Sequence, residues 1–134
     1  MDTFYAQILT PEGAIFEGDV TGVQLPGTLG SFEVKYNHAA LVSMLDIGRI
    51  RIRHQSESGE DDTIIAVAGG FVEVSDNKLT LLAESAQKSS QIDTNAARNE
   101  LKEARQKLDA NPMEREDLER IIRKAENLLK VAEN

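Results

Sequence analysis

Apolar and polar residues alternate over short stretches in the first two thirds of the chain, a pattern typical of β-strands. The clearest stretch is 49–53, in which Ile50 and Ile52 fall on one face and three arginines on the other. We therefore expect one face of this strand to be buried and the other to contact water. The same pattern predicts further short strands at 4–9, 14–16, 20–25, 32–34, 41–45, 64–68, 71–74 and 79–82.

Residues that favour turns separate these stretches, for example Thr10-Pro11-Glu12-Gly13 and Asp46-Ile47-Gly48. Gly69-Gly70 matches no phosphate-binding loop pattern, and we interpret it as a turn or bulge where a side chain would clash. No segment with a helical period lies between the strands. The sequence therefore predicts an antiparallel β-sandwich of about ten strands.

The last third of the chain has a helical period instead. Ser90, with Asp93 three residues later, is the predicted N-cap of a helix that extends to about Leu108. Asn111 is the predicted cap of a second helix, with Pro112 at its first position. The short turn between the helices predicts an antiparallel hairpin. The apolar face of the first helix consists of Ala97, Leu101, Ala104 and Leu108. That of the second consists of Leu118, Ile121, Ile122, Ala125, Leu128, Leu129 and Ala132.

The composition changes together with the period, and we place a domain boundary there. Residues 1–88, the β-sandwich domain, hold 13 acidic and 6 basic residues, whereas residues 89–134, the helical hairpin, hold 10 and 9. In the hairpin, acids precede bases by four residues, an arrangement that adds about 0.2 to 0.5 kcal/mol per pair. The predicted pairs are Glu103 with Lys107, Glu116 with Arg120, Glu119 with Arg123, and Glu126 with Lys130.

Length and charge exclude several classes of protein. The chain has 134 residues, enough for one domain with an appendage, and a net charge of −8. Such an acidic protein is not suited to neutralising phosphate backbones, so nucleic acid is not an expected partner. No stretch approaches the roughly 20 apolar residues of a membrane span, and no secretory leader is recognisable. We expect a soluble, cytosolic chain without a transmembrane segment.

Catalytic and metal-binding patterns are missing from the sequence. There is no cysteine, and the two histidines, His38 and His54, are too far apart in sequence for a helical zinc motif. The serines lack the G-x-S-x-G setting of a nucleophile elbow. The acidic run 57–62 lacks the alternating ligands of a calcium loop, and we interpret it as a solvated hairpin tip. We therefore predict a protein that is not an enzyme and has no metal site.

Several segments together resemble the epsilon subunit of F-type ATP synthases, in order and spacing, over essentially the whole chain. The most specific combination is the G-G-F-x-E-V strand pair and the N-H-A segment, followed by a two-helix tail. The matching segments are 25–27 with 30–34, Asn37 to Leu41, 48–52, 65–74, 79–83, and Ile92-Asp93 at the start of a helix.

The resemblance implies a subunit of the central rotor, which joins the gamma subunit to the c-ring of a proton-translocating complex. Its hairpin would change position and inhibit ATP hydrolysis by the alpha and beta subunits. The implied location is peripheral, on the cytoplasmic side of the membrane that carries the synthase, as in a bacterial inner membrane. The candidate rotor-interface residues are Ser31, Phe32, Glu33 and His38.

The resemblance also implies a candidate nucleotide site on the hairpin, since some bacterial members bind ATP through an I-D-x-x-R-A motif. Ile92 and Asp93 match the start of this motif, but Ala96 stands where the motif has its arginine. The candidate nucleotide-binding residues are Glu84, Ile92, Asp93 and Arg98. Because this loses a permanently charged phosphate partner, we expect no cofactor and no firm ATP site. Two alternatives remain open: a module whose main role is nucleotide binding, and an adaptor whose hairpin pairs with an unrelated coiled coil.

Overall fold

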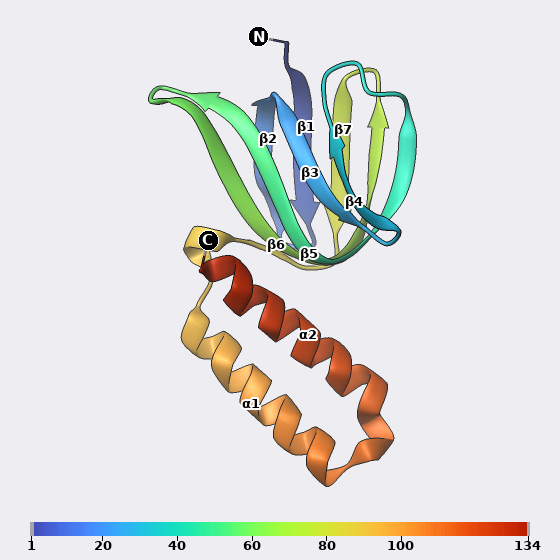
Figure 1. Ribbon diagram of the computed structural model, residues 1–134, viewed down its shortest axis with the longest axis vertical. Coiled ribbons are helices and arrows are strands. Elements are labelled where there is room, and N and C mark those ends of the chain that lie inside the picture. Colours follow the sequence, from blue (N-terminus) through green and yellow to red (C-terminus); the bar gives the residue numbers. More distant parts are fainter. Residues whose placement is uncertain (1, 134) are drawn as a thin grey trace.

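The computed structural model describes residues 2–133, in which eight strands are followed by two long helices (Figure 1). The strands are β1 (Phe4–Thr10), β2 (Gly13–Val20), β3 (Gly22–Gly27), β4 (Gly30–Val34), β5 (Leu41–Ser56), β6 (Gly59–Ser75), β7 (Lys78–Ala83) and β8 (Ala86–Lys88). The helices are α1 (Thr94–Ala110) and α2 (Arg115–Ala132), and short 3-10 turns occupy Ser89–Gln91 and Pro112–Glu114. Figure 1 shows the strands above and the helical hairpin below them.

The eight strands form one sheet that folds over itself. Its order is β2-β1-β7-β6-β5-β3-β4, and β8 pairs with β6. The two longest strands, β5 and β6, pair from Leu41 opposite Val74 to Ser56 opposite Gly59. Because both strands curve along their length (Figure 1), each contributes to both layers of the sandwich.

The positions of the buried side chains show where β5 and β6 change layer. Val67 and Val72 of β6 are both buried, and so are Leu45 and Ile50 of β5, although each pair is five residues apart. In a flat strand, residues an odd number apart point to opposite faces. Each strand must therefore bend between them, and we call this bend, formed by residues 46–48 and 68–70, the corner.

Two glycines permit the bend in β6. Gly69 and Gly70 have φ values of +80° and +137°, in the region that favours glycine. A Cβ on Gly70 would collide with the carbonyl oxygen of Leu82 and lie 2.9 Å from the Cα of Ala83, both in β7. The predicted clash is confirmed, but the predicted turn or bulge is wrong, because β6 continues through both glycines and keeps its register with β5. The predicted turn at 46–48 is wrong for the same reason, since β5 continues through it.

The sandwich is confirmed, with eight strands rather than about ten. The predicted strands 41–45 and 49–53 join in β5, and 64–68 and 71–74 join in β6, because the corner bends the strands without ending them. One pair is parallel rather than antiparallel: β1 lies beside β7, with Tyr5 opposite Lys78. Five strands separate these two along the chain, so no hairpin sets their relative direction.

The predicted faces of the strand at 49–53 are confirmed. Ile50 and Ile52 are fully buried in the core. On the opposite face, Arg51 contacts Asp62 at 2.6 Å and Arg53 lies 3.6 Å from Glu33. Arg51 and Arg53 thus pair with acids of neighbouring strands at the surface, while the isoleucines fill the core.

The first helix of the hairpin begins later than predicted, at Thr94. Asp93, not Ser90, is the N-cap of α1, and its Oδ1 accepts a hydrogen bond from the Ala96 N–H at 3.0 Å. Ser90 instead lies in the preceding 3-10 turn. Asn111 is a cap as predicted, since its Oδ1 accepts from the Met113 N–H at 3.2 Å, but it caps the 3-10 turn before α2. The helix α2 itself begins three residues later than predicted, at Arg115. Small buried side chains, such as Ala104 and Ala125, let the two helices pack closely.

We expect residues 1–88 to fold without the hairpin. Every buried residue of the main core cluster within 2–133 comes from a strand, from Phe4 to Ala83. The fragment should show one cooperative thermal transition by circular dichroism, with a melting temperature less than about 15 °C below that of the full chain. A fragment without a cooperative transition would contradict this division of the chain.

Candidate functional site: the junction of hairpin and corner

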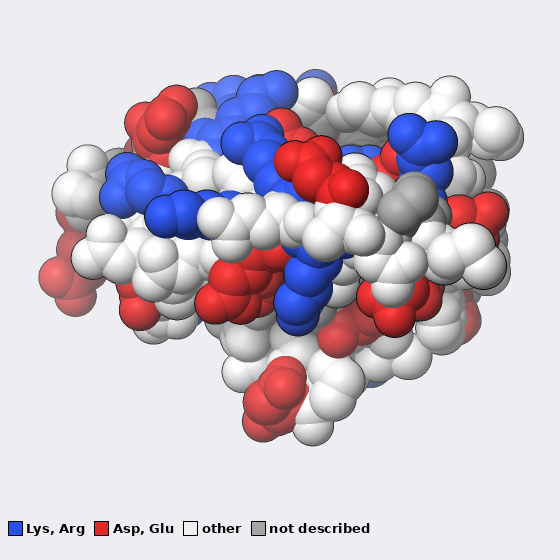
Figure 2. All heavy atoms as spheres, turned by 90° about the horizontal axis from the view of Figure 1, so that it is seen from below, with Lys and Arg blue, Asp and Glu red and all other residues white. Residues whose placement is uncertain are grey.

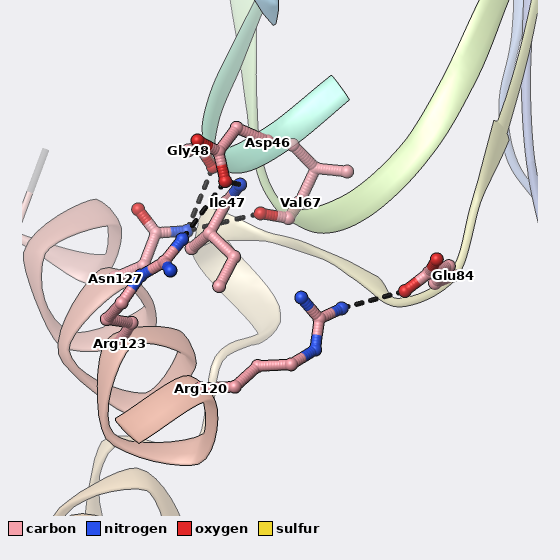
Figure 3. Close-up of polar contacts among 8 residues, drawn as sticks. All are labelled: Asp46, Ile47, Gly48, Val67, Glu84, Arg120, Arg123 and Asn127. Atoms are coloured by element: carbon pink, nitrogen blue, oxygen red, sulfur yellow. Dashed lines mark hydrogen bonds and ion pairs between the residues drawn. The ribbon is translucent and has the colours of Figure 1, made fainter. Parts of the chain in front are cut away.

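Three side chains of α2 reach the corner of the sheet (Figure 3). Arg120, Arg123 and Asn127 are spaced by three and four residues, so they lie on one face of the helix. Figure 3 shows them pointing toward Glu84, Asp46 and the backbone of the corner. This junction joins the two parts of the chain through polar side-chain contacts.

The first contact joins Arg120 to Glu84. The Arg120 Nη2 lies 2.7 Å from the Glu84 Oε2. Glu84 directly follows β7, and its backbone N–H donates to the Gly69 carbonyl at 3.1 Å. A Cβ on Gly69 would lie 2.7 Å from that carboxylate oxygen and 3.2 Å from the same guanidinium nitrogen. The glycine therefore leaves the space that this ion pair occupies.

The second and third contacts involve the bent strands β5 and β6 themselves. The Arg123 Nη2 lies 3.0 Å from the Asp46 Oδ1, which also accepts from the Ile47 N–H at 2.8 Å. The Asn127 amide nitrogen donates to the Gly48 carbonyl at 2.9 Å and to the Val67 carbonyl at 3.4 Å. Asn127 thus donates to one backbone carbonyl of each bent strand. Such carbonyls need hydrogen-bond partners when α2 covers them.

The two ion pairs are too exposed to stabilise the junction strongly. The side chains of Arg120 and Glu84 are 52% and 63% exposed, and those of Arg123 and Asp46 are 57% and 53% exposed. Exposed pairs of this kind contribute about 0 to 1 kcal/mol each. Asn127 is half-buried. The junction therefore fixes where α2 sits more than it adds to the free energy of unfolding.

The junction also corrects two predicted ion pairs. Arg120 and Arg123 contact Glu84 and Asp46 rather than Glu116 and Glu119 of their own helix. Glu119 instead contacts Arg115 at 3.1 Å. The sequence contained the signal for a basic face on α2 but not the identity of its partners, because those come from the sheet.

Three residues of the predicted nucleotide site have other polar contacts. Glu84 pairs with Arg120, and the Asp93 carboxylate caps α1. The Arg98 Nη1 donates to the Asn95 Oδ1 at 3.3 Å, and Ile92 is half-buried after the 3-10 turn. The structure therefore groups Glu84 with Arg120, which the prediction had not included.

The candidate rotor-interface residues lie on β4 and in the loop after it. Ser31 is exposed, Phe32 is half-buried against the core, and Glu33 lies 3.6 Å from Arg53 and 3.7 Å from Lys35. The His38 Nδ1 lies 2.8 Å from the Ala39 carbonyl oxygen. Ser31 and Glu33 thus lie on one edge of the sheet, and His38 in the connection that follows.

An exposed row of apolar side chains crosses the outer face of the sheet, and the prediction did not name it. Met44, Phe71 and Leu82 are neighbours in register on β5, β6 and β7, and Leu82 pairs with Leu9 of β1. Val42, Met44, Phe71 and Leu82 are 71%, 59%, 38% and 40% exposed. We call Leu9, Val42, Met44, Phe71 and Leu82 the apolar stripe. Contiguous exposed apolar surface of this kind marks a site of interaction.

Two kinds of feature are absent from residues 2–133. No helix in this range is both long and apolar enough to cross a membrane. No three acidic, histidine or cysteine side chains in it lie close enough together to hold a metal ion.

The fold and the junction define a β-sandwich domain with a helical hairpin docked at the corner of its sheet. The sequence profile of the ATP synthase, Delta/Epsilon chain, beta-sandwich domain matches residues 3–89. An ATP synthase epsilon chain of Halalkalibacterium halodurans is 35% identical over 135 residues, which cover 98% of each chain. One of Salinibacter ruber is 36% identical over 81% of this chain and 76% of its own length. The chain belongs to the family of ATP synthase epsilon chains.

Solved structures share this fold. A chain in the cryo-EM structure of the Euglena gracilis mitochondrial ATP synthase, comprising OSCP, F1 and c-ring, has a TM-score of 0.80 over 98% of this chain and 82% of its own. A chain in the central stalk and c-ring structure of the Tetrahymena thermophila mitochondrial enzyme has a TM-score of 0.55 over 66% and 68%. Their sequence identities are 21% and 20%, so they establish similarity of fold.

Proposed function

We propose that this chain is a rotor subunit of a proton-translocating ATP synthase, which joins the gamma subunit to the c-ring. The observation that carries the proposal is the apolar stripe, which lies on a domain whose core is complete without it. Such a surface fits a protein partner that remains bound during turnover. We assign gamma to the apolar stripe, and the c-ring to the region of Ser31, Phe32, Glu33 and His38.

The hairpin has a regulatory role in this proposal. It inhibits ATP hydrolysis by the alpha and beta subunits when it leaves the corner, and it makes or breaks no covalent bond. Its weak, exposed contacts with the sheet support a movable element. The chain acts at the cytoplasmic face of the membrane, which in a bacterium is the inner membrane, and is held there by its partners.

Regulation without bound ATP is part of the same proposal. Asp93 is engaged as a helix cap, and Glu84 already has a cationic partner in Arg120. A nucleotide would have to displace both contacts. Isothermal titration of the full chain with MgATP should therefore show no saturable heat, whereas saturable binding would favour the alternative of a nucleotide-binding module.

Reconstitution with purified partners tests the proposal. The full chain should co-purify with gamma and lower the ATPase activity of an F1 assembly that lacks its own epsilon chain. A chain ending at Lys88 should still bind gamma but should no longer inhibit, since it lacks the hairpin. Failure of the full chain to bind gamma would contradict the rotor assignment, and full inhibition by the shortened chain would contradict the regulatory role of the hairpin.

A further inference from the structure

We propose that Arg120 and Arg123 exchange partners when the hairpin leaves the corner. Arg120 passes from Glu84 to Glu116, and Arg123 passes from Asp46 to Glu119. Each of these two arginines then has a carboxylate partner in both states, so their charges oppose movement little. This inference rests on the proposed function in one respect, namely that the hairpin moves.

The spacing on α2 places the second set of partners within reach. Glu116 and Glu119 each precede their arginine by four residues, so they share its side of the helix. An acid four residues before a base is the more favourable of the two orders. Within the part of the chain that the structure describes, Glu116 makes no ion pair, and Glu119 contacts only Arg115, at 3.1 Å.

The surroundings of both arginines allow the exchange without burial of charge. Their side chains are about half exposed in the docked state, so either set of partners lies in high-dielectric surroundings. The view from the hairpin side shows acidic and basic side chains interspersed over this surface (Figure 2). A guanidinium that leaves the sheet therefore has a carboxylate close by on its own helix.

Asn127 has no such replacement. Its amide donates to the carbonyls of Gly48 and Val67. On undocking, the amide and both carbonyls form hydrogen bonds with water instead. The neighbours of Asn127 on α2 include the half-buried Leu128, which faces the same surface of β6. The docking equilibrium is therefore set mainly by this amide and by apolar contact, and the ion pairs specify the position of the helix.

The exchange can be measured in the isolated full chain with a single thiol. The sequence has no cysteine, and Ala66 is 3% exposed beneath Lys124, Asn127 and Leu128. In an Ala66→Cys background, the rate of reaction with a thiol reagent reports the fraction of molecules in which α2 has left the sheet, even when that fraction is small.

Two double variants should move this rate in opposite directions. Glu116→Gln with Glu119→Gln removes the partners of the undocked state. Because Glu119 also pairs with Arg115 in the docked state, the net slowing comes from Glu116 and should be about 1.4- to 2.3-fold. Asp117, three residues before Arg120, remains as a weaker partner for this arginine, so we expect a change of rate toward the lower end of this range. Asp46→Asn with Glu84→Gln removes the partners of the docked state and should speed the reaction about two- to thirtyfold.

A matched control separates partner exchange from a general change of charge. Glu100→Gln with Glu114→Gln also removes two acids from the hairpin, but neither lies three or four residues from Arg120 or Arg123. This control should react at nearly the rate of the Ala66→Cys parent. A slowing equal to that of the Glu116 and Glu119 variant would assign the effect to net charge and overturn the proposal.

Salt gives an independent readout. Between about 50 and about 500 mM NaCl the parent rate should change less than about twofold, because screening weakens the pairs of both states. More salt should speed the reaction of the Glu116 and Glu119 variant and slow that of the Asp46 and Glu84 variant. Parallel salt dependence in all three proteins would overturn the exchange. Gamma binding and ATPase inhibition test the proposed function separately, since these thiol rates need neither partner nor nucleotide.

Discussion

Phe71→Glu is expected to weaken binding of the chain to the gamma subunit by about 100-fold or more. Phe71 lies in the middle of the apolar stripe, between Met44 and Leu82 in register. A carboxylate there would lose its water on binding without a compensating partner. Since the Phe71 side chain is 38% exposed in the free chain, the substitution should leave the fold intact.

The affinity can be measured by biolayer interferometry with purified gamma. Phe71→Leu keeps an apolar side chain and should stay within about tenfold of the parent. Met113→Glu provides a matched control, because Met113 is 91% exposed at the far end of the hairpin. Equal affinities for Phe71→Glu and Met113→Glu, with unchanged melting temperatures, would remove the apolar stripe from the gamma interface.

The strands and helices were predictable because each has a local signal. Ile50 and Ile52 alternate with arginines, and Asn111 precedes a proline, so burial and capping follow from neighbours in the sequence. The start of α1 was misplaced because Ser90 and Asp93 are both good caps. The choice between them depends on the path of the chain after β8, which the local sequence does not determine.

The corner and the junction were not predictable in the same way. Gly69-Gly70 reads as a break, and only its pairing with β5 and β7 shows that the strand continues. Arg120 and Arg123 have suitable acids at four residues' distance, so the helix pattern alone favours the wrong partners. Partners such as Glu84 and Asp46 are 36 and 77 residues away, and they become neighbours only when the corner forms.

The apolar stripe was missed for a related reason. In strands such as 79–82 both faces carry apolar residues, since Leu81 is fully buried and Leu82 is 40% exposed. Alternation then gives no indication of which face meets water. The available signal was the apolar character of both faces at 41–45 and 79–82, a pattern that favours an interaction surface on the outer face.

Gly70→Ala is expected to lower the free energy of unfolding by about 4 kcal/mol or more and the melting temperature by about 15 °C or more. The new Cβ would meet the carbonyl of Leu82 and the Cα of Ala83, which are backbone atoms of β7 and cannot rotate away, and alanine disfavours the φ of +137°. β7 would have to separate from β6 at the corner, where the Glu84 N–H also donates to the Gly69 carbonyl.

Thermal and urea unfolding measure the loss of stability. Gly22→Ala is the control, because its Cβ would lie 3.4 Å from the Glu33 Oε2, at the end of a flexible side chain. That control should cost no more than about 1 kcal/mol. Equal stability of the two variants would mean that the bend in β6 does not require glycine, and the corner would then have to be held by the contacts of Asp46 and Asn127 instead.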